Sequence, residues 1–265
     1  MSIFKSWLNE IIEDTLREYK RFRNIDENKA REEIINSIKY YKGDLQLRDK
    51  LVVNQSLENK WYESLKNGKP DYSIYGDDYY FCDMVACWWI YSKNYLMKIW
   101  KKGIVKDIGS SKIIIDVGNG LGFTTGALKE LFPEARVIGV NLRNTLQYQY
   151  ATDYGRKTGF TMIGDIAEIN GQADMVFASE YFEHIQKPIH DLRRIIQYAN
   201  PRTFIIANSF GSRSIGHFNY YYDGENAPVN NKKIAKLFSA ELRKLGYTKI
   251  KTGLWNDRPA YWKKT

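Results

Sequence analysis

"IIIDVGNGLGFTTGALKELFP", residues 113–133, joins a strand-like segment to a helix-like segment through a turn with three glycines. The isoleucines lead into Asp116, and the glycines follow at every second position, at 118, 120 and 122. Glycine adopts positive φ angles without strain and lets a ligand approach the backbone closely. In open α/β sheets, ligands bind beyond the carboxyl ends of the strands. The stretch therefore predicts a ligand-binding turn after a buried strand.

The alternation of strand-like and helix-like segments continues along the rest of the sequence. Helical segments are expected from about residue 122, at 145–157, from about residue 189 and at 232–245. The strand-like runs are "KIIIDV", "ARVIGVNL", "FTMIGD", "ADMVFAS", "TFIIANS", "YTKIKTGLW" and "AYWKK", of which the last two are expected to be antiparallel. Apolar strands that alternate with helices imply a parallel sheet covered on both faces. The sequence predicts a doubly wound, Rossmann-like α/β fold with seven strands, parallel except for an antiparallel edge hairpin.

Residues 1–102 differ in character and are expected to be helical. Apolar residues recur every three or four positions around 7–19 and 34–41, and a third helix is expected at about 77–100. The segment "NGKPDYSIYGDDYY" before this third helix is rich in turn residues and tyrosine. These features predict an N-terminal helical cap or lid at 1–102.

Composition limits the partners and the compartment. Forty Lys and Arg against thirty-one Asp and Glu give a net charge of +9, which favours anionic partners such as nucleotides, phosphorylated sugars or nucleic acid. Cys82 and Cys87 are five residues apart on an expected helix, so they face different sides and predict neither a disulfide nor a metal site. No signal peptide or membrane-spanning run is recognised. A cytoplasmic protein without a metal or a membrane partner is expected, and the sequence indicates no oligomeric state.

The register of the glycines separates the classes of nucleotide site. A dinucleotide site needs G-x-G-x-x-G, but Phe123 stands where the third glycine would fall, and the helix lacks the Lys-Ser/Thr pair of a P-loop. The pattern D-x-G-x-G-x-G instead resembles motif I of the class I S-adenosylmethionine-dependent methyltransferases. "VIGVNL", "IGDIAEI" and "ADMVFASEYFEHIQKPIHDLRRII" resemble the family's later strand ends in the same order. The last of these is similar to the branch that acts on small molecules.

This resemblance implies S-adenosyl-L-methionine as the cofactor, together with its contacts. Asp116 is expected near the methionine amino end, and Asp165 at the adenine amino group with the next side chain packed on the ring. Asn141 stands where the family has an acidic residue that binds the ribose hydroxyls; an amide can pair with them, but without the strength of a charge. The expected cofactor-binding residues are Asp116, Gly118, Asn119, Gly120, Gly122, Asn141, Leu142, Asp165, Ile166, Ser179 and Glu180.

Candidate catalytic residues follow the fourth and fifth strands. Glu180, Glu183 and His184 come after the fourth strand, and His217 lies in a Gly-rich insertion near 208–231 after the fifth. Because histidine titrates near neutral pH, His217 and His184 are the leading candidates for a general base, with Glu180 as the third catalytic candidate. In the family the histidine of "EHI" often organises the loop beside the cofactor, which is the alternative for His184.

Acceptor contacts are expected from loop residues. Tyrosines in loops can stack on a sugar or a base and bind polar groups, whereas tyrosines on helices more often belong to the core. Asn208, at the end of the fifth strand, could orient an acceptor hydroxyl or cap a turn. The expected substrate-binding residues are Tyr72, Tyr75, Tyr79, Asn208, His217 and Tyr220.

Together the motifs predict an enzyme, a methyltransferase domain at 103–265 with an acceptor-binding insertion near 208–231. The chain has "SEYF" where amino-group base methylation uses Asn/Asp-Pro-Pro-Tyr/Phe, and neither cysteine lies in the Pro-Cys turn of cytosine-5 methylation. The expected function is methylation of oxygen or nitrogen on a small polar acceptor, which can be sugar- or nucleotide-linked. Two alternatives stay open: a nucleic-acid-binding modification methyltransferase and a catalytically silent cofactor-binding module.

Overall fold

A computed structural model describes residues 48–76, 109–169, 171–222, 227–253 and 259–265, together with residues 13, 26–28, 31, 32 and 35. The chain divides into two compact units, Met1–Asn94 and Tyr95–Thr265. The helices predicted around 7–19, 34–41 and 77–100 lie wholly or almost wholly outside the described residues, as does Tyr79. Within the part of the chain that is described, no helix combines the length and the apolar character needed to cross a bilayer.

The first unit contains helix α3 (Arg48–Lys66) and the 3-10 helix η1 (Tyr72–Gly76). Trp61 on α3 is buried, and its ring centroid lies 5.5 Å from that of Tyr72. The ring of Tyr72 also stacks on Tyr75, with centroids 6.4 Å apart. The tyrosine-rich turn is therefore anchored by aromatic packing on α3, a helix that the sequence analysis did not single out.

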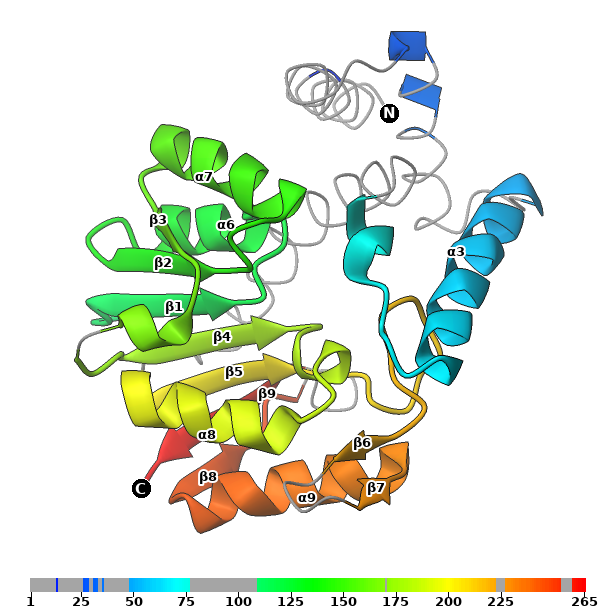
Figure 1. Cartoon of the computed structure of the whole chain (residues 1–265). Helices are drawn as coiled ribbons and strands as arrows, with labels where there is room; N and C mark the ends of the chain where they lie inside the picture. The colour runs from blue at the N-terminus through cyan, green and yellow to red at the C-terminus, as the bar shows by residue number, and fades with distance from the viewer. Residues whose placement is uncertain are drawn as a thin grey trace. The chain divides into compact units, whose positions relative to one another are not determined.

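The second unit is built on a seven-stranded sheet with the order β3-β2-β1-β4-β5-β9-β8 (Figure 1). The strands are β1 (Ile113–Val117), β2 (Arg136–Val140), β3 (Thr161–Ile163), β4 (Met175–Ser179), β5 (Thr203–Ala207), β8 (Tyr247–Ile250) and β9 (Ala260–Lys264). The first five are parallel to one another, whereas β9 pairs antiparallel with both β5 and β8. The predicted fold class is confirmed, including its antiparallel edge.

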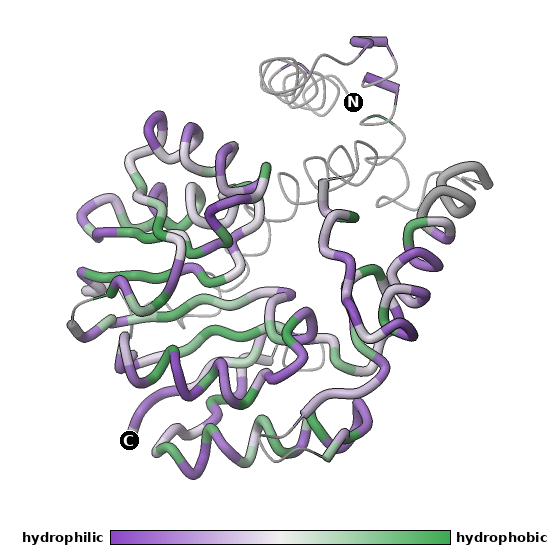
Figure 2. Tube along the Cα trace, viewed as in Figure 1, coloured by the Kyte–Doolittle hydropathy of each residue, from purple (hydrophilic) through white to green (hydrophobic). Residues whose placement is uncertain are grey.

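Among the described residues, four helices flank this sheet (Figure 1). They are α6 (Phe123–Leu131), α7 (Leu146–Thr158), α8 (Pro188–Ala199) and α9 (Asn231–Lys244). Helices α6 and α7 pack together next to β2 and β3, and α8 packs against α9. In Figure 2 the central strands are mainly hydrophobic, whereas the helices carry many hydrophilic residues. The helices therefore pack on apolar strands and expose polar residues to solvent. The burial of these strands removes apolar surface from water on both faces of the sheet.

Local sequence signals explain where these helices begin and end. The side chain of Thr145 accepts a hydrogen bond from the backbone N–H of Tyr148 at the start of α7, and Gly159 ends this helix with a φ of 86°. Asn230 caps α9 in the same way. A short hairpin, β6 (Tyr221–Tyr222) with β7 (Pro228–Val229), lies inside the insertion and was not predicted.

Candidate active site

The glycine turn connects β1 to α6 in a left-handed conformation. Gly118, Gly120 and Gly122 have φ angles of 67°, 52° and 85°, values that residues with a side chain rarely adopt. A Cβ atom on Gly118 would lie 2.2 Å from Cδ2 of Tyr181, and one on Gly122 would lie 2.8 Å from Cζ of Phe160. The missing side chains at Gly118 and Gly122 therefore make room for the rings of Tyr181 and Phe160, which pack directly against the backbone of the turn.

Asp116 lies beneath this turn and is almost completely buried. Its Oδ2 accepts hydrogen bonds from the hydroxyls of Thr124 and Thr125, each at 2.7 Å. Asn119 extends this network, because its Nδ2 donates to Oγ1 of Thr125 at 3.0 Å. Burial raises the pKa of Asp116 from 3.8 to about 7, against the opposing effect of the two hydroxyls. A cation near this carboxylate would favour its charged form.

The raised pKa of Asp116 predicts a pH dependence of stability. Between pH 3.8 and about 7 the folded protein retains a proton that the unfolded chain has released. The stabilisation is therefore complete below the unfolded pKa and is lost as the pH rises toward the folded pKa. We expect this group to lower the free energy of unfolding by up to about 4 kcal/mol across that range. In urea unfolding across the same pH range, the free energy of unfolding of Asp116→Asn should depend less on pH than that of the wild type. An equal pH dependence of the two proteins would contradict the raised pKa of Asp116.

Asn141 follows β2 and holds the glycine turn in place. Its Nδ2 donates to the backbone carbonyl of Gly120 at 3.2 Å, while its Oδ1 accepts from the backbone N–H of Leu142 at 2.8 Å. A carboxylate cannot donate to a carbonyl, which gives a physical reason for an amide at this position. Leu142 beside it is 64% exposed, so its apolar side chain is available to a ligand. Contact of either residue with the ribose or adenine stays a prediction.

A tight turn after β4 brings two carboxylates together. Glu180 has a φ of 51°, and the 3-10 helix η3 (Phe182–His184) follows immediately. The turn at Glu180 reverses the chain before η3, and Glu183 on η3 comes to lie beside Glu180. Oε1 of Glu183 accepts a hydrogen bond from the backbone N–H of Ser209, beyond the end of β5. Burial, and secondarily the Glu180 carboxylate, raise the pKa of Glu183 well above its usual value.

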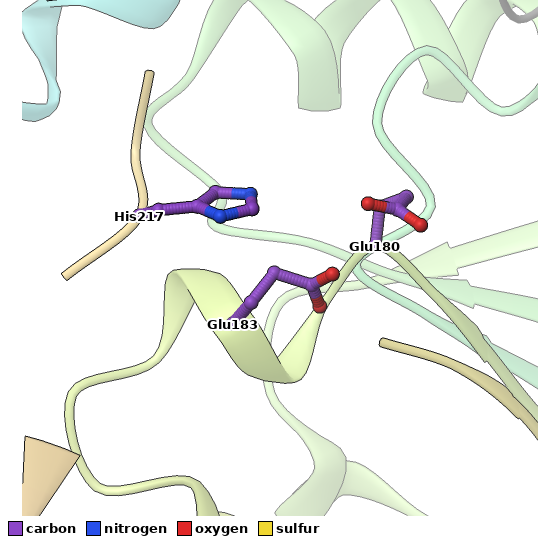
Figure 3. Close-up of side chains that lie close together, drawn as sticks. All are labelled: Glu180, Glu183 and His217. Atoms are coloured by element: carbon purple, nitrogen blue, oxygen red, sulfur yellow. The ribbon is translucent and has the colours of Figure 1, made fainter. Parts of the chain in front are cut away.

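His217 completes this group from the insertion (Figure 3). The imidazole is 3% exposed, and its Nδ1 lies 2.8 Å from the backbone carbonyl of Ser212. A ligand atom of His217 and one from each carboxylate of Glu180 and Glu183 all lie within 4.8 Å of one another. We call these three residues the acidic-histidine cluster. The spacing of Glu180 and Glu183 in the sequence could have indicated the carboxylate pair, but nothing in the sequence indicated its proximity to His217.

His184 lies beside the cluster and has a different environment. Its ring meets that of His217 edge to face, with centroids 4.8 Å apart. Burial, followed by the charge of His217, lowers the pKa of His184 to about 3, although a hydrogen bond with the backbone of Gly216 partly opposes this. A neutral imidazole bonded to the insertion fits the loop-organising role better than the role of a base.

The insertion that carries His217 is fixed by buried groups. Tyr221 is fully buried, and its hydroxyl donates to the backbone carbonyl of Glu183 at 2.9 Å. The backbone N–H of Tyr222 donates to the carbonyl of Gln186 at 2.9 Å. The ring of Phe210 packs between Tyr221 and Phe238 of α9. The insertion is thus held against the turn after β4.

Removal of the hydrogen bond from Tyr221 to Glu183 tests whether the insertion is needed for catalysis as well as for stability. We expect Tyr221→Phe to cost about 1–2 kcal/mol of stability, because the carbonyl of Glu183 is left without its buried partner. Tyr247→Phe is a matched control, since that hydroxyl donates to the carbonyl of Pro201 at 2.6 Å, in another part of the sheet. Both variants should lose stability in urea unfolding, but only Tyr221→Phe should slow methyl transfer. Equal rates for the two variants would mean that the insertion does not position the site.

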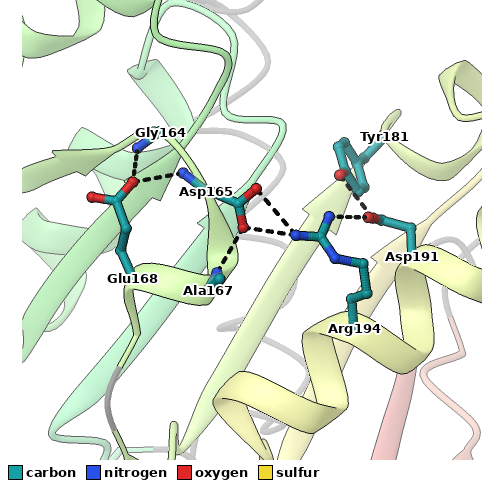
Figure 4. Close-up of polar contacts among 7 residues, drawn as sticks. All are labelled: Gly164, Asp165, Ala167, Glu168, Tyr181, Asp191 and Arg194. Carbon is teal, nitrogen blue, oxygen red and sulfur yellow. Dashed lines mark hydrogen bonds and ion pairs between the residues drawn. The ribbon is translucent and has the colours of Figure 1, made fainter.

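Asp165 follows β3 and is engaged by protein groups (Figure 4). Its carboxylate accepts from the backbone N–H of Ala167 at 2.8 Å and from Arg194 of α8 at 2.8 and 3.1 Å. Arg194 also lies 3.7 Å from Asp191, which accepts a 2.8 Å hydrogen bond from the hydroxyl of Tyr181. A polar chain therefore runs from Asp165, the expected adenine contact, to the tyrosine ring that covers Gly118.

The other predicted site residues lie in varied places. Ile166 and Ser179 are buried at the ends of β3 and β4, next to Asp165 and Glu180. Asn208 is half-buried, and its Oδ1 is buried with no hydrogen-bond partner within the described part of the chain. Tyr220 is 58% exposed on the insertion. Tyr72 and Tyr75 belong to the first unit, and Tyr79 is not described. These roles stay predictions.

Comparison with known proteins agrees with the fold of the second unit. Residues 115–207 match the family model described as a methyltransferase domain. No curated protein matches the sequence. An O-methyltransferase family protein from Burkholderia thailandensis is 12% identical, with 82% of this chain and 71% of that chain covered and a TM-score of 0.51. That likeness supports the fold.

Two further solved structures are similar at lower TM-scores. The mitomycin 7-O-methyltransferase is 13% identical, with 84% of this chain and 71% of that chain covered and a TM-score of 0.49. A putative O-methyltransferase from Nostoc punctiforme is 13% identical, with 80% and 70% covered and a TM-score of 0.45.

Proposed function

We propose that the chain, whose residues 115–207 match a methyltransferase domain, is a class I S-adenosylmethionine-dependent methyltransferase that methylates an oxygen or nitrogen atom of a small polar acceptor. The observation that carries this proposal is the position of the acidic-histidine cluster. The cluster follows β4 and β5, and Tyr181 between its glutamates lies against Gly118 of the glycine turn. The proposed donor and acceptor sites are therefore neighbours at the carboxyl ends of the strands, where ligands of open α/β sheets bind.

The protein has to position two molecules for this reaction. When bound, S-adenosylmethionine supplies a methyl group on a positively charged sulfur. The acceptor atom must then be held in line with that group, and its proton must be accommodated. Glu180, Glu183 and His217 offer oxygen and nitrogen atoms that accept hydrogen bonds from a hydroxyl or an amine. We propose that the acceptor's reacting group lies against this cluster, and that Asn208 and Tyr220 contact other parts of the acceptor.

The cofactor's place follows from the strand ends. We propose that the cofactor lies against the backbone of the turn at Gly118, Gly120 and Gly122. Its methionine end is proposed to lie near Asp116 and Asn119. Asn141 and Leu142 are proposed to contact the ribose and adenine after β2. Asp165 and Ile166 are proposed to contact the adenine from β3, with Arg194 orienting the Asp165 carboxylate.

Burial of the cluster favours a small acceptor over nucleic acid. Glu183 is 0% exposed and His217 is 3% exposed, so a reacting group must enter the protein to reach them. The name of the Burkholderia thailandensis protein, an O-methyltransferase family member, supports oxygen as the accepting atom. A sugar- or nucleotide-linked acceptor would fit the net charge of +9.

The test combines binding and turnover. Calorimetry with S-adenosylhomocysteine should show binding. Transfer of a tritiated methyl group should then be measured to a panel of hydroxylated and amino small molecules and to RNA and DNA oligonucleotides. Transfer to a small molecule, without salt-dependent transfer to oligonucleotides, is the expected result. Absence of binding, binding without transfer to either panel, or transfer to oligonucleotides alone would overturn the proposal.

A further inference from the structure

We propose that Glu180, Glu183 and His217 bind a divalent metal ion that coordinates the acceptor through oxygen. The inference deepens and rests on the proposed function, since it assigns a chemical task to the same cluster. The sequence predicted no metal site, since the spacing of its two cysteines does not suit one. The structure instead brings together two carboxylates and one imidazole, which are ordinary ligands of divalent metal ions.

The arrangement of the donor atoms is the first support. One ligand atom from each residue lies within 4.8 Å of the others. The three residues come from two segments that the fold holds together, namely the turn after β4 and the insertion after β5 (Figure 3). Metal–oxygen and metal–nitrogen bonds of about 2.0–2.2 Å put neighbouring ligand atoms of an octahedral or tetrahedral site about 3–3.6 Å apart. Side-chain movements of at most about 2 Å would therefore bring the three atoms to the spacing of a metal site.

The orientation of His217 is the second support. Its Nδ1 lies 2.8 Å from the carbonyl oxygen of Ser212, a distance at which the Nδ1–H donates to that oxygen. This bond selects the tautomer whose lone pair is on Nε2, and the ring points toward the two carboxylates (Figure 3). Metal-binding histidines commonly donate their second ring N–H to a backbone carbonyl in this way.

Glu183 gives the third and independent support. The residue is 0% exposed, and its Oε2 is buried without a hydrogen-bond partner among the described residues. Its other oxygen is already used by the backbone N–H of Ser209. A buried carboxylate oxygen that faces a second carboxylate needs either a shared proton or a cation. The lone pair of His217 points at the same space from a third side. A metal ion there would bind all three residues, whereas a shared proton would join only the two carboxylates.

The position of the site suggests what the ion would do. Three protein ligands leave coordination positions open, as catalytic metal sites do. A hydroxyl oxygen bound there would lose its proton more easily, because the ion stabilises the negative charge, and the carboxylate oxygen of Glu180 that does not bind the ion would accept that proton. Chelation would favour acceptors with two neighbouring oxygen atoms. The proposal thus narrows the acceptor from oxygen or nitrogen to a hydroxyl compound.

Direct binding of Mn²⁺ tests the site without an acceptor. The full chain, freed of metal with a chelator and desalted, is titrated with Mn²⁺ while free Mn²⁺ is measured by electron paramagnetic resonance. We expect a single tight site per chain, with Glu183→Gln and His217→Gln each weakening it by about 100-fold. Glu241→Gln is the matched control, because that carboxylate pairs with Arg193 outside the cluster, and it should bind as the wild type does.

Two further measurements keep the outcome clear. Far-ultraviolet circular dichroism verifies that each variant is folded, and either cluster variant alone suffices if the other does not fold. Saturable Mn²⁺ binding that both cluster variants leave unchanged, or no binding at all, would overturn the metal site in favour of a shared proton. Calorimetry with S-adenosylhomocysteine on the same samples separates the two proposals. Cofactor binding without Mn²⁺ binding counts against the metal alone, whereas absence of cofactor binding counts against the proposed function.

Discussion

Gly118→Ala should abolish cofactor binding and destabilise the protein by about 2–4 kcal/mol. Two costs combine at this position. Gly118 has a φ of 67°, which a residue with a Cβ adopts only with strain. The new methyl group would also lie 2.2 Å from Cδ2 and 2.9 Å from Cγ of Tyr181. That ring cannot simply swing away, because its hydroxyl is bonded to Asp191.

The measurement pairs calorimetry with S-adenosylhomocysteine and urea unfolding. Gly246→Ala is the matched control, because its φ is 86° but no atom of the described residues lies within 4 Å of its added Cβ. It should show the backbone strain alone and bind the cofactor product normally. Adding Tyr181→Ala to Gly118→Ala should restore part of the stability, since it removes the clash. Wild-type affinity in Gly118→Ala would mean that the turn does not face the cofactor.

The fold could be predicted from the sequence because its signals are local. Apolar strands, the capping residue Thr145 and Gly159 at the end of α7 each act within a few residues, and the predicted helix at 145–157 is observed at Leu146–Thr158. The hairpin β6–β7 has only two residues in each strand, too few for a periodic pattern. The helix α3 lacks a strong apolar stripe, so its existence depends on packing around residues such as Trp61.

The site was less predictable, because the roles of its residues depend on contacts between residues that are far apart in the sequence. The spacing of the glycines was enough to predict the glycine turn. Asn141 donates to Gly120, 21 positions away, and Arg194 donates to Asp165, 29 positions away. Glu183 was noticed but not chosen, since its burial depends on Ser209 and Tyr221 beyond β5. Side chains that the sheet topology brings together cannot be paired from one sequence alone.

Glu183→Gln should nearly abolish methyl transfer while leaving the protein as stable or more stable. In metal-free buffer the wild type buries a carboxylate oxygen without a hydrogen-bond partner in the described part of the chain, facing Glu180. An amide keeps the bond from Ser209 and can donate to Glu180, which removes the repulsion between like charges. We expect a gain of about 1 kcal/mol in the free energy of unfolding. Activity should fall at least about 100-fold, because either a ligand of the acceptor or a ligand of the metal is lost.

The opposite signs of these two effects make the prediction sharp. Glu241→Gln, the control on α9, loses the 2.7 Å ion pair with Arg193 and should be slightly less stable, by at most about 1 kcal/mol, yet fully active. Urea unfolding in a chelator and methyl transfer measured on both variants give the comparison. A strong loss of stability in Glu183→Gln would show that the carboxylate supports the fold through its bond to Ser209. Retained activity would remove Glu183 from the acceptor site, and with it the chemical reason for its burial beside Glu180 and His217.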